Sequence, residues 1–267
     1  MKKVVLVTGG GTGIGAATAG LLADAGWTVA ICGRRGAVLD GVAGARSDIV
    51  PFVADLEDPE ANASLVSSVV SSLGRLDALV LNAGVQHMAT VAEQTLEQWN
   101  QMLAVNLTSP FLLLQAALPQ LLEHRGSVVT VSSVAALRSP NAMAGYAPSK
   151  AAVLSLAQQF AVDYGPAGIR SNVVCPGWTR TELADEEMGH IAAERGTSLE
   201  ESYGFVTSFV PQRRAAAANE VASVIAFLLS DAASYINAAV ITVDGGHVAL
   251  DPGTIPFDPR VTIEGDV

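Results

Sequence analysis

Tyr146 and Lys150 are the residues whose types and spacing most directly suggest chemistry, because they lie four positions apart. On an α-helix such a pair shares one face, one turn apart. A free phenol has a pKa of about 10, and a nearby ammonium group favours the phenolate and lowers that pKa. A useful acid and base at neutral pH needs about 3–4 kcal/mol of such stabilisation. The alternative interpretation is that Tyr146 and Lys150 are unrelated neighbours on a solvated helix face. The surrounding elements must decide between the two interpretations.

The start of the chain predicts a strand, a glycine turn and a helix. An apolar run at residues 4–7 leads into the glycine-rich stretch 8–15, and helical spacing continues over residues 16–25. Glycines allow a pyrophosphate to approach the backbone, and a helix N-terminus offers unpaired N–H groups and a positive dipole end. No Gly-Lys-Ser/Thr follows, which disfavours a Walker-type loop. An ordinary glycine turn is the alternative. The predicted cofactor contacts are Gly9, Thr12, Gly13, Ile14 and Gly15.

The second predicted strand, residues 27–32, ends in Gly33-Arg34-Arg35. Dinucleotide-binding folds place the group that contacts the adenosine ribose near this point: a carboxylate for a 2′-hydroxyl, or arginine for a 2′-phosphate. The two arginines therefore favour NADP, with NAD possible and a solvated arginine pair as the alternative. After a third strand at 49–53, Asp55 and Leu56 are predicted to lie against the adenine. Residues 58–73 then read as a helix that begins with Asp58-Pro59.

Two further strands end in residues suited to a site. The strand at 76–81 is followed by Asn82-Ala83-Gly84, whose small residues let a cofactor lie against the backbone, and the strand at 126–131 runs into Ser132-Ser133. Ligands in a doubly wound sheet bind outside the carboxyl ends of strands, so Ser133 points where chemistry would occur. A nucleophilic role would need a GxSxG-type elbow and a suitable histidine, and neither is present. A hydrogen-bond donor is the more economical role for Ser133.

The intervening and following segments complete an alternating α/β pattern. Thr95 is predicted to cap a helix that reaches Asn106, and Ser109-Pro110 restarts a helix to Leu122 with a kink at Pro119. Asn106 lies among apolar residues, so it is either a satisfied structural group or part of a site. Later elements are a helix from Tyr146 to 165–166, a strand at 169–174, a helix capped by Asn219 and a strand at 240–243. Residues 179–214 read as a substrate lid of short helices. Its Met188, Tyr203, Phe205 and Phe209, with Met143, either line an apolar pocket or pack the lid.

Composition narrows the class of protein. The chain has 267 residues, half of them hydrophobic, a net charge of −11 and two cysteines. The acidic balance argues against a nucleic-acid partner, and the lack of a long uninterrupted apolar segment against a membrane span. The two cysteines read as buried hydrophobes, so no disulfide or metal site is expected. These features predict a cytoplasmic protein with one catalytic domain at residues 1–246 and a tail at 247–267.

Together these motifs closely resemble the classical short-chain dehydrogenase/reductase family over roughly residues 3–246. The resemblance rests on motifs in the family's order: Thr8-Gly9…Gly13-Ile14-Gly15, Asn82-Ala83-Gly84, Asn106, Ser133, Tyr146…Lys150 and Pro176-Gly177. It implies a single-domain, Rossmann-type, doubly wound parallel sheet of about seven strands with helices on both faces. It also implies NAD(P)-dependent interconversion of a secondary alcohol and a ketone, and assembly as a homotetramer.

The resemblance also implies residue roles. Tyr146 would be the acid and base, Lys150 would lower its pKa and bind the nicotinamide ribose, and Ser133 would hydrogen-bond the substrate oxygen. Asn106 would hold a water that reconnects Lys150 to bulk solvent. Pro176, Gly177 and Thr179 would seat the nicotinamide.

Several features depart from the family pattern. Leu81 replaces a frequent asparagine, the glycine loop carries no basic residue, Asn237-Ala238-Ala239 replaces a frequent Thr-Gly turn, and the tail is long enough to pack at a subunit interface. Two other functions stay open. One is an NAD(P)-bound epimerase or isomerase, whose relatives usually have a longer C-terminal substrate domain. The other is a non-catalytic nucleotide sensor, which would have little reason to keep Tyr146, Lys150, Ser133 and Asn106 together.

Overall fold

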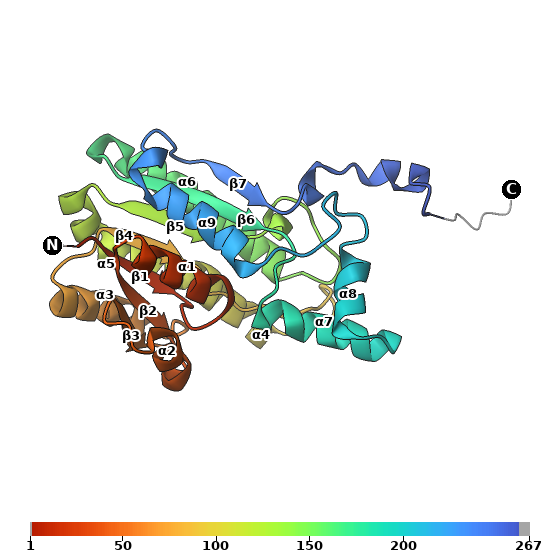
Figure 1. Cartoon of the computed structure of the whole chain (residues 1–267), viewed down its shortest axis with the longest axis horizontal. Helices are drawn as coiled ribbons and strands as arrows, with labels where there is room; N and C mark the ends of the chain where they lie inside the picture. The colour runs from red at the N-terminus through yellow and green to blue at the C-terminus, as the bar shows by residue number, and fades with distance from the viewer. Residues whose placement is uncertain (1, 262–267) are drawn as a thin grey trace, which may run out of the picture.

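The fold is built on one seven-stranded, all-parallel sheet with strand order β3-β2-β1-β4-β5-β6-β7 (Figure 1). The structure is a computed structural model that describes residues 2–261; Met1 and residues 262–267, the end of the expected tail, lie outside the described residues. The strands are β1 (Val4–Thr8), β2 (Thr28–Gly33), β3 (Ile49–Val53), β4 (Ala78–Leu81), β5 (Ser127–Val131), β6 (Arg170–Pro176) and β7 (Val240–Val243). The expected doubly wound parallel sheet is confirmed.

Strand order reverses between β1 and β4, and this reversal locates the site. The chain lays β2 and β3 to one side of β1, then crosses over to β4 on the other side. In such sheets a crevice opens at the carboxyl ends of the two strands that flank the reversal. The glycine loop after β1 and Asn82-Ala83-Gly84 after β4 therefore face each other across this crevice.

Helices cover both faces of the sheet, and each strand contributes alternate side chains to the apolar clusters on the two faces. In β1, Val5 and Val7 point into one apolar cluster while Val4 and Leu6 point into the other, as alternation requires. The first cluster includes residues of α1 (Gly13–Asp24), α2 (Gly36–Ala43) and α9 (Ala218–Leu229). The second includes residues of α3 (Pro59–Leu73), α5 (Ser109–His124) and α6 (Tyr146–Tyr164). Figure 1 shows α1 and α9 side by side on the sheet.

The structure differs from the sequence analysis in two local features. The helix α2, between β2 and β3, was not predicted; it is short and buries only Leu39 and Ala43, so its periodicity is weak. Asn219 was expected to cap α9, but it lies inside the helix, which begins at Ala218. Glu220 supplies the cap instead: its carboxylate accepts a hydrogen bond from the Ala217 N–H at 2.9 Å.

The expected break at Asn106 is a π-helical turn within a continuous helical segment. The turn η1 (Ala104–Thr108) joins α4 (Leu96–Leu103) directly to α5, and Thr95 caps α4 as expected. A wider turn accommodates Pro110, which has no N–H for an ordinary helical bond. The whole segment, Leu96–His124, is long and apolar enough by length and composition to cross a membrane, but 44% of its most apolar window is buried inside the fold. It packs against α3 and β4 as a layer of the fold.

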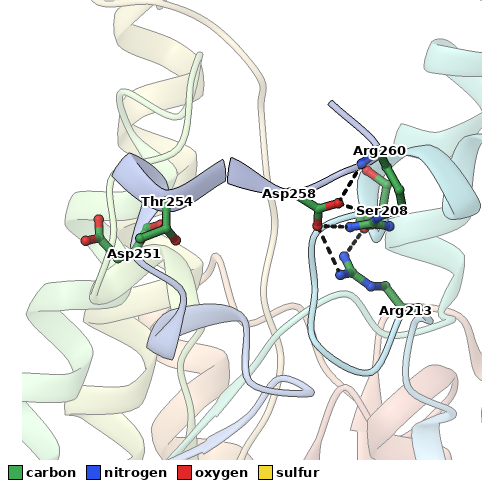
Figure 2. Close-up of polar contacts among 6 residues, drawn as sticks. All are labelled: Ser208, Arg213, Asp251, Thr254, Asp258 and Arg260. Carbon is green, nitrogen blue, oxygen red and sulfur yellow. Dashed lines mark hydrogen bonds and ion pairs between the residues drawn. The ribbon is translucent and has the colours of Figure 1, made fainter. Parts of the chain in front are cut away.

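Two short helices and a tail complete the chain beyond the carboxyl ends of the strands. α7 (Glu182–Arg195) and α8 (Leu199–Val206) pack together around Met188 and Tyr203, and in Figure 1 the tail continues from β7 past α8. The tail contains the turns η5 (His247–Ala249) and η6 (Pro252–Phe257). Figure 2 shows how its far end is tied down: Asp258 pairs with Arg260 at 2.7 Å and with Arg213 at 3.5 Å. Arg260 also donates to the Ser208 carbonyl at 2.9 Å, which attaches the tail to the segment after α8.

Candidate functional site

A cavity of about 450 Å³ opens at the carboxyl ends of the central strands, at the expected crevice. Its walls include many of the predicted site residues. Those are Gly9, Thr12, Gly13, Ile14, Asn82, Ala83, Gly84, Ser133, Tyr146, Lys150, Pro176, Gly177 and Thr179. A second cavity of about 200 Å³ is lined by Arg34, Arg35, Asp55 and Leu56. The two cavities share wall residues of the glycine loop and of the loop after β4, so they adjoin.

The glycine loop forms a cradle that larger residues could not form. Gly9 and Gly13 adopt left-handed backbone conformations, with φ of 62° and 52°. Thr12 is extended at the N-cap of α1 but its side chain makes no capping hydrogen bond, so it leaves the first-turn N–H groups to other acceptors. Gly15 lines neither cavity; a Cβ there would lie 2.1 Å from the Gly9 carbonyl oxygen. Gly15 therefore shapes the loop, and the cradle fits a pyrophosphate at a helix N-terminus.

The loop after β4 is braced against β1. The Thr8 hydroxyl accepts hydrogen bonds from the Asn82 and Ala83 N–H groups at 2.9 and 3.0 Å, and the Asn82 amide donates to the Thr8 carbonyl at 2.9 Å. Thr8 belongs to the glycine-loop motif but was not predicted as a site residue, because the sequence does not show that its hydroxyl bonds to the loop after β4. Gly84 lies close to the charged end of the site: a Cβ there would come within 3.2 Å of Lys150 Nζ.

Tyr146, Ser133 and Lys150 lie together in the larger cavity. Tyr146 is the first residue of α6, and Lys150 follows one turn later with its Nζ 5.7 Å from the Tyr146 ring centroid. Lys150 is only 4% exposed, and its Nζ donates to the Val131 carbonyl at the end of β5 at 3.1 Å. The Ser132 hydroxyl donates to the Lys150 carbonyl at 2.8 Å, which ties α6 to the same strand end.

Burial dominates the electrostatics of this pair. It raises the pKa of Tyr146 to about 12, which the hydrogen bond with Ser133 partly offsets by favouring the phenolate. Burial lowers the pKa of Lys150 to about 8, because the charged ammonium loses its hydration. Lys150 is not among the groups that shift the pKa of Tyr146 in this structure, so its role in lowering that pKa stays a prediction. The phenol is held as a proton donor.

Asn106 lies behind the site, on the π-helical turn, and is 1% exposed. Its side-chain oxygen accepts from the Val85 N–H at 2.9 Å, while its amide donates to the Val85 carbonyl at 2.9 Å and to the Ser149 hydroxyl at 3.0 Å. Both halves of the amide are therefore satisfied. Asn106 lines neither cavity and joins the loop after β4 to α6.

Sequence reasoning chose Thr179 in the loop after β6 and missed Thr181. The Thr179 hydroxyl donates to the Gly177 carbonyl at 3.1 Å and is thus engaged within its own loop. Thr181 also lines the larger cavity, caps α7 by accepting from the Ala184 N–H at 3.2 Å, and lies against the glycine loop, 2.9 Å from where a Gly13 Cβ would be. A threonine directly before an acidic first turn is an N-cap signal that could have identified it.

The remaining wall of the larger cavity comes from segments far apart in the chain. It includes Gln86, Met143, Trp178, Leu183, Glu187 and His247. Of the residues offered as pocket or lid packing, only Met143 lines the cavity; Met188 and Tyr203 are buried between α7 and α8. Phe205 and Phe209 stack against arginine side chains. Most of these residues therefore pack the lid and do not line the cavity. Gln86 and Glu187 are polar residues of the cavity wall that the sequence analysis did not identify.

Comparisons with known proteins agree with this geometry. Residues 9–247 match the family model described as enoyl-(acyl carrier protein) reductase. The chain is 37% identical to protein MoaE of Klebsiella aerogenes, covering 96% of this chain and all of that protein. It is 34% identical to levodione reductase of Leifsonia aquatica, covering 92% and 94%, and 34% identical to meso-2,3-butanediol dehydrogenase of Serratia marcescens, covering 94% and 96%.

A solved structure shows the same arrangement of elements. The crystal structure of levodione reductase superposes with a TM-score of 0.88 at 32% identity, covering 93% of this chain and 98% of that chain. The family match, the identities and the coverage all concern the stretch that holds the glycine loop, Ser133, Tyr146 and Lys150. The chain belongs to the short-chain dehydrogenase/reductase family.

Proposed function

We propose that this protein is a nicotinamide-dependent oxidoreductase that interconverts a secondary alcohol and a ketone, with NADP as its favoured cofactor. The observation that carries the proposal is that Ser133, Tyr146 and Lys150 share one cavity, which adjoins a second cavity lined by Arg34 and Arg35. One cavity suits a reacting carbonyl beside a nicotinamide, and the other suits the adenosine end of the same cofactor. Relatives with reductase and dehydrogenase names support this reaction class.

The chain's own residues would handle the proton. A bound nicotinamide would supply or accept the hydride. In reduction, Tyr146 would donate its phenolic proton to the substrate oxygen while Ser133 hydrogen-bonds that oxygen and limits the charge that develops on it. In oxidation, Tyr146 would accept the proton. The raised pKa of Tyr146 suits the first role, and a positively charged neighbour would favour the second.

Lys150 and Asn106 would support this proton transfer. Lys150 is buried behind Tyr146, close to Gly84, where it could reach a ribose hydroxyl. The role that the family resemblance implies for Asn106, holding a water, stays a prediction, because Val85 and Ser149 already engage its side-chain amide.

The preference for NADP rests on the end of β2. Gly33-Arg34-Arg35 offers two guanidinium groups and no carboxylate at the position that contacts the adenosine ribose. Asp55 and Leu56 line the same cavity and would lie against the adenine. Pro176, Gly177 and Thr179, with Thr181, would border the nicotinamide.

We further propose that residues 179–214 act as a substrate lid and that the protein is a cytoplasmic homotetramer. α7 contributes Leu183, Ala184 and Glu187 to the wall of the larger cavity, which supports a lid role. Phe111 on α5 and Val162 on α6 are 48% and 66% exposed, which supports a subunit contact through these helices. The tail would pack at such an interface.

A screen of ketones and secondary alcohols against both cofactors, monitored by the absorbance of reduced nicotinamide, tests the proposed reaction. We expect cofactor turnover with at least one class of carbonyl and higher kcat/KM with NADPH than with NADH. Cofactor binding without any oxidation or reduction across the screen would contradict the proposal and favour the nucleotide-sensing alternative. Exchange of substrate stereochemistry without net cofactor turnover would favour the epimerase alternative.

A further inference from the structure

A carboxylate faces the substrate side of the larger cavity. Glu187 lines this cavity from α7 together with Leu183 and Ala184, which lie one turn earlier on the same face of that helix. Its neighbour Glu186 is exposed and is not part of the wall. The helix therefore turns one specific carboxylate inward, toward the space that Tyr146 and Met143 also border.

Gln86 holds this carboxylate in place. The Gln86 amide, in the loop after β4, donates to Glu187 Oε2 at 2.9 Å and lines the same cavity. Within residues 2–261 this is the one hydrogen bond that Glu187 receives through its side chain, so Oε1 keeps its capacity to accept. An ionised carboxylate can accept about four hydrogen bonds, and this one, in a residue that lines the cavity, uses only one of them.

The basic groups in the same wall are engaged elsewhere. Arg138 donates to the Leu137 and Val248 carbonyls at 3.1 and 3.2 Å, and Lys150 donates to the Val131 carbonyl. Glu187 forms no ion pair in the part of the chain that the structure describes. A half-buried carboxylate normally has a cation or several donors as partners. The geometry thus leaves a place for a donor that the protein itself does not provide.

The carboxylate is also electrostatically connected to the reacting group. Burial raises the pKa of Glu187, which Gln86 partly offsets, and the Glu187 charge raises the pKa of Tyr146. A substrate that reaches Tyr146 therefore passes within the field of Glu187. His247, which lines the cavity from the tail, is the other titratable group on this wall besides those already described.

We propose that Glu187, oriented by Gln86, is a specificity-determining residue that accepts a hydrogen bond from a second donor group of the substrate, a hydroxyl or an ammonium near the reacting carbon. This inference rests on the proposed function and deepens it by naming the substrate class: alcohols that carry a neighbouring donor. A site with a buried acceptor discriminates strongly against analogues that lack the donor, because the acceptor would then be desolvated without a partner.

A matched set of cyclohexane derivatives tests this inference, since the ring fixes the spacing between the two groups. The NADP-loaded enzyme is assayed with cyclohexanol, with cis- and trans-1,2-cyclohexanediol and with 2-aminocyclohexanol, using the wild type, Glu187→Leu, Glu187→Gln and Gln86→Leu. Glu186→Gln is the control, because it makes the same charge change on an exposed position of the same helix. Binding of each compound to the enzyme–NADP complex is measured in parallel by calorimetry, so a compound that is not oxidised still reports on recognition.

We expect the wild type to favour a donor-bearing compound over cyclohexanol. Glu187→Leu should lower kcat/KM, or the binding constant, for that compound about 10- to 100-fold more than it changes the same quantity for cyclohexanol. Gln86→Leu should show a smaller loss of the same kind. Glu187→Gln separates the two donors: the amide oxygen still accepts from a hydroxyl but carries no charge, so a preference for ammonium should be lost far more than a preference for hydroxyl.

Three outcomes would overturn the inference: no preference of the wild type for a donor, an equal loss on cyclohexanol in the Glu187 variants, or the same loss in Glu186→Gln. Failure of the proposed function is distinct. In that case none of the compounds is oxidised by the wild type, while the binding comparison still decides whether Glu187 recognises the donor.

Discussion

Arg35 Nη2 donates to Glu182 Oε2 at 2.7 Å, and this ion pair joins the end of β2 to the first turn of α7. The two arginines at the end of β2 therefore differ. Arg35 shares its guanidinium with a carboxylate, whereas Arg34 forms no ion pair among residues 2–261 and lines the same cavity. Both members of the Arg35–Glu182 pair are largely exposed, so water and salt weaken it, and a phosphate dianion would compete effectively for Arg35.

The first prediction concerns cofactor choice. Arg34→Ala should raise KM for NADPH about 10-fold or more and change KM for NADH little, because a charge-assisted hydrogen bond to the 2′-phosphate is lost. Glu182→Gln should lower KM for NADPH, since it frees Arg35 and removes a nearby negative charge. Steady-state kinetics with both cofactors measure this, and equal losses for the two cofactors in Arg34→Ala would contradict the phosphate assignment.

The second prediction concerns the proton donor. Tyr146→Phe should lower kcat by about 10²- to 10⁴-fold while NADPH still binds, because only the phenolic hydroxyl group is removed. Tyr164→Phe is the matched control: it lies at the other end of α6, stacked on Phe160, outside the cavities. Turnover is followed by cofactor oxidation and binding by cofactor fluorescence. Substantial residual reduction by Tyr146→Phe would exclude the assigned role.

The third prediction concerns pH and stability. Because burial lowers the pKa of Lys150 from 10.5 to about 8, the unfolded chain binds a proton between these values that the folded cofactor-free protein does not. The free energy of unfolding is therefore lowered by the buried Lys150 ammonium by about 2–4 kcal/mol below pH 8. This penalty shrinks as pH rises from about 8 and is gone above pH 10.5. Urea unfolding should show Lys150→Met gaining stability over the wild type below pH 8, with the gap closing toward pH 10.5. Exposed Lys2→Met should show no such gap.

The fourth prediction separates two glycines of α1. Gly15→Ala should destabilise the protein by about 2–4 kcal/mol, because the new Cβ would lie 2.1 Å from the Gly9 carbonyl oxygen and displace the loop. Gly20→Ala, on the same helix with nothing within 4 Å of the new Cβ, should stabilise by about 0.5–1 kcal/mol. Thermal unfolding of both variants measures the contrast. A similar effect of the two substitutions would show that the loop adapts.

The fifth prediction concerns the tail. A chain ending after Leu250 keeps His247 and Val248 in the cavity wall, whereas one ending after Gly246 loses both. The shorter chain should raise the substrate KM and leave cofactor binding and the circular dichroism spectrum unchanged. Full activity of the shorter chain would show that the tail does not contribute to the substrate site.

Sequence reasoning reached the sheet and most of the cavity because those features depend on local patterns. Apolar runs followed by glycines or small polar residues mark β1 and β4 with their loops, and these segments meet at the reversal of strand order. The short helix α2 was not predicted, because it buries only two side chains and so has a weak apolar periodicity. The Glu187–Gln86 pair escaped for a different reason: it joins α7 to the loop after β4, and no local pattern encodes a contact between such distant segments.

The packing of α1 against α9 sets an order of events during synthesis. Ala19, Leu22 and Ala23 of α1 are covered partly by Val221, Ile225 and Leu228 of α9, which emerge from the ribosome some two hundred residues later. Until then the glycine-loop helix has an incomplete apolar partner, and contacts so far apart in the chain form slowly. We therefore expect the apolar face of α1 to stay partly exposed in the nascent chain through most of its synthesis. The glycine loop should become rigid only when α9 has packed against α1.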